Sequence, residues 1–155
     1  MRKWAFLLIS LILLTLQITW PSFLSIFRVK PDLLLVFSIA AVFYLDYPKA
    51  LLISILCGLL KDIFLPYPMG LNTILFAAWS YLIYRLCRQI SAEQDYMRLA
   101  IVFLVSLFNN IIILLQSLNS GNLIPAGIIL RNLLVSSIYT AAVSPLIFKL
   151  TKKTA

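Results

Sequence analysis

Side chains that could take part in chemistry are scarce in this sequence, and the most informative are carboxylates set among apolar residues. The 155 residues include five acidic residues, two cysteines and no histidine. Asp32 follows Pro31 at the start of one apolar stretch, and Asp62 follows Lys61 near the end of another. A charge held within a bilayer costs roughly 2.5–3.5 kcal/mol on insertion scales, so such charges point to a function. Adjacent helical residues point about 100° apart, so Lys61 and Asp62 are not expected to pair with each other.

The composition excludes most kinds of catalysis at these positions. Without histidine, neither a Ser-His nor a Cys-His nucleophile can form. Cys57 and Cys87 lie in apolar runs and are interpreted as small hydrophobic residues, and two cysteines alone do not make a metal site. No phosphate-binding loop or nucleophile elbow is present. We therefore expect no catalytic residue, no metal and no cofactor, which leaves a binding, transport or scaffold role.

Each carboxylate has both a structural and a functional interpretation. Pro31-Asp32 is typical of a helix start, where aspartate accepts hydrogen bonds from the free N–H groups of the first turn. Asp62 can be a charge tolerated at a helix end that reaches the membrane interface. The functional alternative is a polar network at one rim of a helix bundle. Its expected members are Asp32, Asp62, Gly70 and Asn72.

These residues belong to a chain with the composition of a membrane protein. Hydrophobic residues make up 63% and charged residues 12%, whereas a soluble domain has about 45–50% and about 25%. Residues 99–118 carry no charge, and this run is long enough to cross a hydrocarbon core of about 30 Å. The sequence predicts an all-α membrane protein, one polytopic domain over residues 1–155. The predicted spans are about 4–20, 32–45, 50–65, 71–87, 99–118 and 132–150.

The basic residues predict the orientation of these spans. The net charge is +8, and the basic residues flank the apolar runs instead of forming an amphipathic surface. With six spans, most Lys and Arg residues fall on one side, which the positive-inside rule places in the cytoplasm. Five spans, the alternative, would force one basic end across the membrane. We therefore expect six spans in the cytoplasmic membrane, both termini in the cytoplasm, contact with anionic lipid and no nucleic-acid binding.

Polar residues in the last two stretches predict contacts between helices. Ser106 and Asn110 share one face of the fifth stretch. Ser136, Thr140 and Ser144 repeat every four residues in the sixth, a small-residue seam that permits close backbone approach. Both packing within the bundle and docking of another membrane protein are compatible with this pattern.

Three motifs in the first half of the chain resemble the MreD family of bacterial rod shape-determining membrane proteins. They are Lys30-Pro-Asp-Leu-Leu-Leu-Val36, Gly58-Leu-Leu-Lys-Asp-Ile-Phe64 and Pro68-Met-Gly-Leu-Asn72, in the order and spacing of that family. The residues that match the family motif, which the resemblance assigns to architecture or partner docking, are Pro31, Asp32, Gly58, Asp62, Gly70 and Asn72.

The resemblance implies a non-enzymatic scaffold of the cell-wall elongation machinery. The partners it implies are MreC, a single-span protein, together with MreB filaments, a SEDS glycosyltransferase and a class B penicillin-binding protein in lateral peptidoglycan synthesis. It also implies a six-helix fold like that of the substrate-binding subunits of energy-coupling-factor transporters. The alternative function is therefore a solute-binding subunit of such a transporter. The Ala-xxx-Ala docking motif of those subunits is missing here, because Ala5 is followed by Ile9.

Overall fold

The computed structural model describes residues 2–19, 30–64, 70–89, 95–119 and 126–154, and within these ranges every regular element is a helix. The prediction of an all-helical protein is therefore confirmed for the described residues. The helices are α1 (Arg2–Ile18), α2 (Leu33–Tyr44), α3 (Tyr47–Phe64), α4 (Leu71–Gln89), α5 (Asp95–Asn119) and α6 (Ala126–Thr154).

The short helix α2 forms the centre of the bundle. Ten of its twelve residues are buried, as expected for a helix that is apolar on every side. It packs against α3, α6 and α4 and also contacts α1 and α5. At 1.5 Å per residue α2 is about 18 Å long, shorter than a hydrocarbon core of about 30 Å. The helices around α2 therefore fix its position on all sides.

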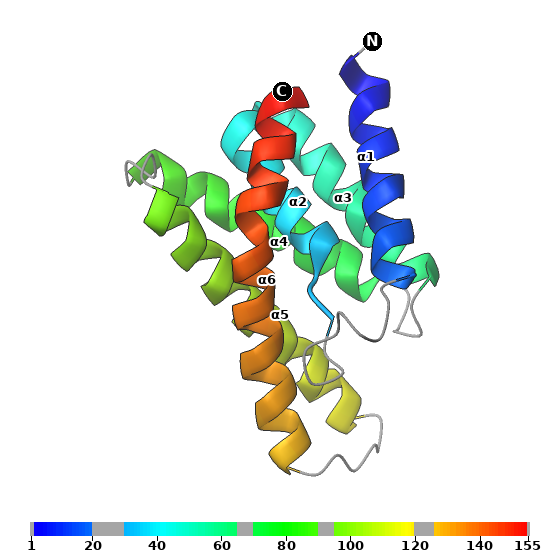
Figure 1. Ribbon diagram of the computed structural model, residues 1–155, viewed down its shortest axis with the longest axis vertical. Coiled ribbons are helices and arrows are strands. Elements are labelled where there is room, and N and C mark those ends of the chain that lie inside the picture. The colour runs from blue at the N-terminus through cyan, green and yellow to red at the C-terminus, as the bar shows by residue number, and fades with distance from the viewer. Residues whose placement is uncertain (1, 20–29, 65–69, 90–94, 120–125, 155) are drawn as a thin grey trace.

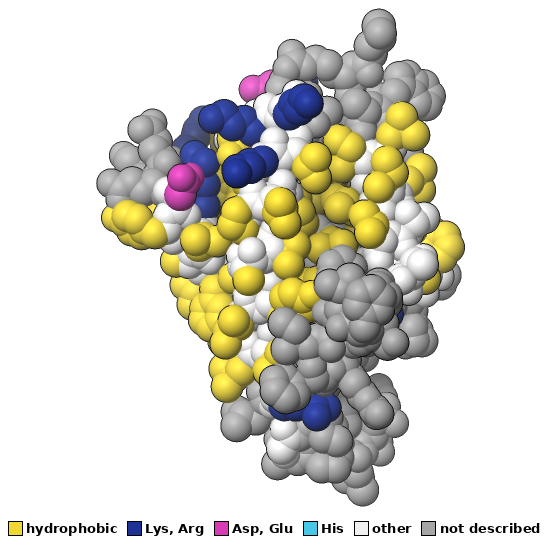
Figure 2. Space-filling model, viewed as in Figure 1, with side chains coloured by type: hydrophobic (Ala, Val, Ile, Leu, Met, Phe, Trp, Pro, Cys, Tyr) yellow, Lys and Arg dark blue, Asp and Glu magenta, His cyan; other side chains and the backbone are white. Residues whose placement is uncertain are grey.

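Two of the helices have the length and composition of membrane spans. Within the described residues these are Asp95–Asn119 and Leu133–Lys153, while Leu8–Ile18 and Leu33–Tyr44 are shorter apolar helices. Large hydrophobic side chains face outward from the bundle, as the space-filling view shows (Figure 2). An apolar exterior of this kind suits contact with lipid. Among its most exposed members are Leu52, Ile63, Ile74, Leu115 and Leu146.

The beginning of α1 and the end of α6 lie at the same end of the molecule (Figure 1). Lys and Arg side chains gather toward that end on the face shown in Figure 2. The hairpin of α5 and α6 extends away from it, past the other helices (Figure 1).

Several helices begin earlier than the apolar runs of the sequence. α5 begins at Asp95 and α6 at Ala126, where the sequence placed spans from residues 99 and 132. Backbone hydrogen bonding does not require apolar side chains, and the acidic Asp95 in the first turn of α5 suits the positive end of the helix dipole. α6 therefore includes residues 126–131, which the sequence placed in the connection between the last two spans.

The turn predicted over residues 46–49 is also shorter than expected. α3 already begins at Tyr47, and Pro48 lies in its first turn, where a missing N–H has no consequence. The carbonyl of Asp46 accepts the N–H groups of Lys49 and Ala50, each at 3.0 Å. The Lys49 ammonium donates to the Asp46 carboxylate at 2.6 Å, and this hydrogen bond lowers the pKa of the carboxyl group.

Candidate functional site

A buried ion pair joins α2 to α3 at the centre of the candidate site. The Lys61 ammonium donates to Oδ2 of Asp32, and the two side chains are only 5% and 12% exposed. The same ammonium lies 5.3 Å from the centre of the Phe76 ring on α4, within the range of a cation–π contact. Removing one partner of a buried pair typically costs about 3–5 kcal/mol, because the other charge is left uncompensated. This pair therefore strongly fixes how α3 lies against the start of α2.

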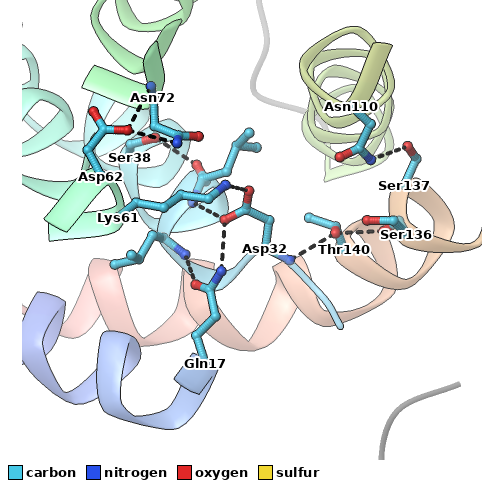
Figure 3. A network of polar contacts seen from close by, with 12 residues as sticks. Gln17, Asp32, Ser38, Lys61, Asp62, Asn72, Asn110, Ser136, Ser137 and Thr140 are labelled. Atoms are coloured by element: carbon cyan, nitrogen blue, oxygen red, sulfur yellow. Dashed lines mark hydrogen bonds and ion pairs between the residues drawn. The ribbon is translucent and has the colours of Figure 1, made fainter. Parts of the chain in front are cut away.

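Asp32 also connects α2 to two further helices (Figure 3). Its Oδ1 caps α2 by accepting the N–H of Leu35 at 3.2 Å, and Nε2 of Gln17 on α1 donates to the same oxygen at 3.5 Å. The backbone N–H of Asp32 donates to Oγ1 of Thr140 on α6 at 3.1 Å. Gln17 makes a second contact with α2, because its Oε1 accepts the backbone N–H of Leu34 at 3.4 Å. One aspartate thus links four helices, α1, α2, α3 and α6.

Asp62 caps the start of α4, although it belongs to α3. Its carboxylate accepts the backbone N–H groups of Gly70, Asn72 and Thr73 at 3.0–3.1 Å. It also accepts Nδ2 of Asn72 at 2.9 Å and Oγ1 of Thr73 at 2.7 Å. The first N–H groups of a helix lack partners within it, and a negative charge is favourable there. Asp62, which belongs to the neighbouring helix α3, provides both the hydrogen-bond acceptors and the negative charge at the start of α4.

Two glycines permit this arrangement, each for a different reason. A Cβ at Gly58 would lie 2.5 Å from Cα of Thr73 and 2.9 Å from the carbonyl oxygen of Asn72, so only glycine allows α3 to approach α4 this closely. Gly70 has a φ of +93°, a conformation that residues with a Cβ rarely adopt. We call this unit the Asp62 cap. Its members are Gly58, Asp62, Gly70, Asn72 and Thr73.

Lys61 and Asp62 point to different partners, as expected for adjacent residues of a helix. In Figure 3 the lysine reaches toward Asp32 while the aspartate reaches toward Asn72. Both side chains are buried, at 4% and 5% exposure, which leaves no room for the interpretation of Asp62 as an exposed charge at a helix end. The ion pair and the Asp62 cap lie next to each other because Lys61 and Asp62 are adjacent residues of α3.

The small-residue seam of α6 faces the interior of the bundle. Thr140 and Ser144 are fully buried. Thr140 donates to the carbonyl of Ser136 at 2.7 Å, and Ser144 donates to that of Ala141 at 2.7 Å. These bonds satisfy the hydroxyl protons within the helix, while the oxygen of Thr140 remains available to accept the N–H of Asp32. Pro31, also buried, precedes this contact. The seam thus places α6 against the start of α2.

Asn110 lies in the contact between α5 and α6, where its Nδ2 donates to Oγ of Ser137 at 3.4 Å. Its neighbour Asn109 is buried, and neither polar atom of its side chain has a hydrogen-bond partner in the described part of the chain. Asn110 is therefore placed beside Ser137 of α6, apart from the ion pair and the Asp62 cap (Figure 3).

The match to a family of known proteins covers nearly the whole chain. A family model described as rod shape-determining protein MreD matches residues 1–154. The chain belongs to the MreD family. The resemblance inferred from the three motifs is therefore confirmed. No curated protein and no solved structure matches the chain.

Membership of the MreD family indicates the general role of this protein. The protein is a membrane protein with a role in rod shape determination, in a family of structural shape-determining proteins that is not known for enzymes. Two helices apolar enough to span a membrane agree with this membership. The residues that carried the resemblance include Asp32 of the ion pair and four members of the Asp62 cap, namely Gly58, Asp62, Gly70 and Asn72. In this MreD chain the family motif thus coincides with the contacts that hold α2, α3 and α4 together.

Several contributors to the site were missed by sequence reasoning. Gln17 and Thr73 carry no pattern that marks them as ligands of Asp32 and Asp62. The partner of Lys61 was also missed, although a lysine within an apolar helix needs an anion nearby and Asp32 begins the preceding helix. A hydrogen bond of 3.1 Å between Ser54 and Ser80, buried between α3 and α4, was not predicted either.

The geometry of the site is that of a structural network. The carboxylates of Asp32 and Asp62 both accept hydrogen bonds from donors of their own chain. In the described part of the chain, no three His, Cys, Asp or Glu side chains are close enough to hold a metal ion. What the arrangement does chemically is to position five helices relative to one another.

Proposed function

We propose that this protein is a non-enzymatic scaffold of the rod-type cell-wall elongation machinery in the bacterial cytoplasmic membrane. The observation that carries the proposal is the ion pair and the Asp62 cap at the positions of the family motif. Asp32 is neutralised by Lys61, and the Asp62 carboxylate accepts hydrogen bonds from the same chain, so that both serve to fix helix positions. A protein that offers partners a surface of constant shape requires such internal links, whereas a site that binds and releases a solute requires polar groups left free for it.

The topology that we propose has six membrane crossings with both termini in the cytoplasm. The common location of the start of α1 and the end of α6 supports an even number of crossings (Figure 1). The concentration of basic side chains toward that end supports its placement in the cytoplasm (Figure 2). A six-helix relation to the substrate-binding subunits of energy-coupling-factor transporters is part of the same proposal and rests on the family resemblance.

The partner that we propose is a single-span protein of the MreC type, docked on the outer face of α5. This face carries exposed apolar residues that are spaced so that they lie along one side of the helix. α5 also extends beyond the rest of the bundle (Figure 1). A stripe at steps of three, four and seven residues suits packing against one other helix. The stripe consists of Leu104, Phe108, Leu115 and Leu118. The MreB filaments, the SEDS glycosyltransferase and the class B penicillin-binding protein are then contacted directly or through this partner.

Affinity purification from native membranes tests this proposal. The tagged protein is extracted in mild detergent, and its partners are identified by mass spectrometry. We expect an MreC-like protein together with wall-elongation enzymes. Recovery of ABC-type ATPase subunits and a coupling protein would instead establish the alternative, a solute-binding subunit. Deleting the gene should round the cells and leave vitamin uptake unchanged.

The docking face has a matched control on α3. Phe108→Ala with Leu115→Ala removes two side chains that are 51% and 60% exposed on α5, whereas Leu52→Ala with Leu56→Ala removes two that are 62% and 42% exposed on α3. We expect the first pair to lower recovery of the single-span partner and the second pair to leave it unchanged. Equal recovery with both pairs would show that α5 is not the docking face.

A further inference from the structure

An open pocket lies where α3 begins and α4 ends, away from the ion pair and the Asp62 cap. Its cavity volume is about 430 Å³. The pocket is lined by three tyrosines and two arginines, namely Tyr47, Tyr81, Tyr84, Arg85 and Arg88. The family motif includes none of these residues, and the proposed scaffold function does not use them.

The aromatic walls of this pocket hold the two guanidinium groups in place. Tyr47 stacks on Tyr84 with ring centres 4.5 Å apart. Arg85 lies 5.6 Å from the Tyr81 ring and donates from Nε to the Tyr81 hydroxyl at 3.1 Å. Arg88 lies 5.0 Å from the Tyr84 ring. Arginine stacked on a ring keeps its outer N–H groups available, and these match phosphate oxygens in pairs.

The two arginines lack an anionic partner within the described residues. The described acidic residues are engaged elsewhere. Asp46 pairs with Lys49 at 2.6 Å and Asp95 with Arg98 at 3.5 Å, while Asp32 pairs with Lys61 and Asp62 caps α4. No ion pair involves Arg85 or Arg88 in this part of the chain. Two positive charges that no described residue neutralises therefore favour a bound anion in this pocket.

The pocket belongs to the basic end of the bundle. Tyr44, at the end of α2, contacts the Phe148 ring of α6 and accepts a hydrogen bond from Arg98 of α5 at 3.1 Å. α3, whose first residue Tyr47 lines the pocket, begins three residues after Tyr44. The last turn of α6 carries two further basic residues, Lys152 and Lys153. Tyrosines and basic residues together are typical of the layer where lipid headgroups meet water. An anion at this depth is presented by the phosphate of a phospholipid.

Exposed apolar side chains of α4 lie at the same level of the helix as the pocket residues. Leu82 and Leu86 are 47% and 43% exposed and are four residues apart on one face of α4, and Leu82 lies three residues before Arg85 on the helix surface. Acyl chains can lie along these residues while the phosphate contacts the arginines. We propose that the pocket lined by Arg85, Arg88 and the three tyrosines is a specific site for the headgroup of an anionic phospholipid.

Native mass spectrometry of the full chain tests this site. The purified, delipidated protein is titrated with phosphatidylglycerol or phosphatidylcholine, and bound lipids are counted. We compare R85Q/R88Q with K152Q/K153Q, which removes the same charge from the same end outside the pocket. Phosphatidylglycerol should bind to the wild type and to K152Q/K153Q alike, and at least tenfold more weakly to R85Q/R88Q. Tenfold corresponds to about 1.4 kcal/mol. Phosphatidylcholine should bind weakly to all three.

A second variant keeps the charge, which makes the test independent of the folding of R85Q/R88Q. R85K/R88K retains both positive charges but cannot form paired hydrogen bonds to phosphate, and we expect it to bind phosphatidylglycerol more weakly than the wild type does. Wild-type affinity in R85K/R88K, or equal losses in R85Q/R88Q and K152Q/K153Q, would reduce the effect to general charge and overturn the proposal.

Two further outcomes would assign the pocket to another ligand. Competition by inorganic phosphate at concentrations equal to that of the lipid would identify a free phosphate as the ligand. Loss of a cytoplasmic protein partner from R85Q/R88Q, with phosphatidylglycerol binding unchanged, would identify an acidic protein segment. Either outcome overturns the lipid site.

Discussion

Replacing Asp62 by asparagine measures what the Asp62 cap contributes to stability. Asparagine keeps one acceptor oxygen and places an NH₂ group where the other oxygen lay. Oδ1 of Asp62 accepts two hydrogen bonds and Oδ2 accepts three, so at least two donors lose their acceptor in either orientation. Hydrogen bonds to a charged group contribute about 1.5–3 kcal/mol each. We expect Asp62→Asn to lower the free energy of unfolding by about 3–6 kcal/mol.

The assay is unfolding of the purified protein in detergent, followed by circular dichroism during titration with a denaturing detergent. Asp46→Asn is the matched control, because it removes a carboxylate whose ion pair with Lys49 is exposed and should leave the transition unchanged. In cells, Asp62→Asn should restore rod shape to a deletion strain poorly, with less protein in the membrane. A loss of stability below about 1 kcal/mol, the size of a single ordinary hydrogen bond, would refute the reasoning.

Three other substitutions test separate contacts by the same unfolding assay. Gly58→Ala forces α3 away from the start of α4 and should lower the free energy of unfolding by about 1–3 kcal/mol, as overpacking does. The control is Gly127→Ala, whose new Cβ meets nothing within 4 Å and should not destabilise the protein. Equal effects of the two substitutions would mean that the close approach of α3 and α4 is unimportant for stability. Lys61→Met leaves the Asp32 carboxylate buried and unpaired and should lower the free energy of unfolding by about 3–5 kcal/mol. Adding Asp32→Asn should recover part of this stability. If the losses of the two single substitutions simply added in the double variant, the ion pair would be contradicted. Thr140→Leu puts a larger side chain at a fully buried position of the seam and should lower both the folding yield and the recovery of the partner. Wild-type values of both would show that the seam does not require small side chains.

The sequence predicts the helices and several site residues, since these depend on local patterns. Apolar runs mark the helices, and Pro31-Asp32 marks the start of α2, where Asp32 does cap the first turn. The proposed rim network of Asp32, Asp62, Gly70 and Asn72 rested on the same kind of pattern. The structure places Asp62 with Gly70 and Asn72, and connects Asp32 to them through Lys61.

The remaining features depend on how distant segments pack, which no local pattern records. Lys61 and Asp32 are 29 residues apart, and Thr140 and Asp32 are 108 residues apart. The need for glycine at position 58 becomes visible only when the Cα of Thr73 lies 2.5 Å from the position of a Cβ there. Helix ends were also misplaced, because apolar runs mark where a helix becomes hydrophobic and not where its backbone hydrogen bonding begins.

The Asp62 cap has a consequence for how the chain enters the bilayer. In the six-span topology that we propose, α3 on its own would bring a negative charge into an apolar layer, and α4 would bring a helix start whose N–H groups have no acceptors. The two costs offset each other when both segments enter as a pair, because the carboxylate of one is the acceptor for the other. Membrane insertion of α3 and α4 is therefore expected to be concerted, with α3 held beside the insertion machinery until α4 has been synthesised.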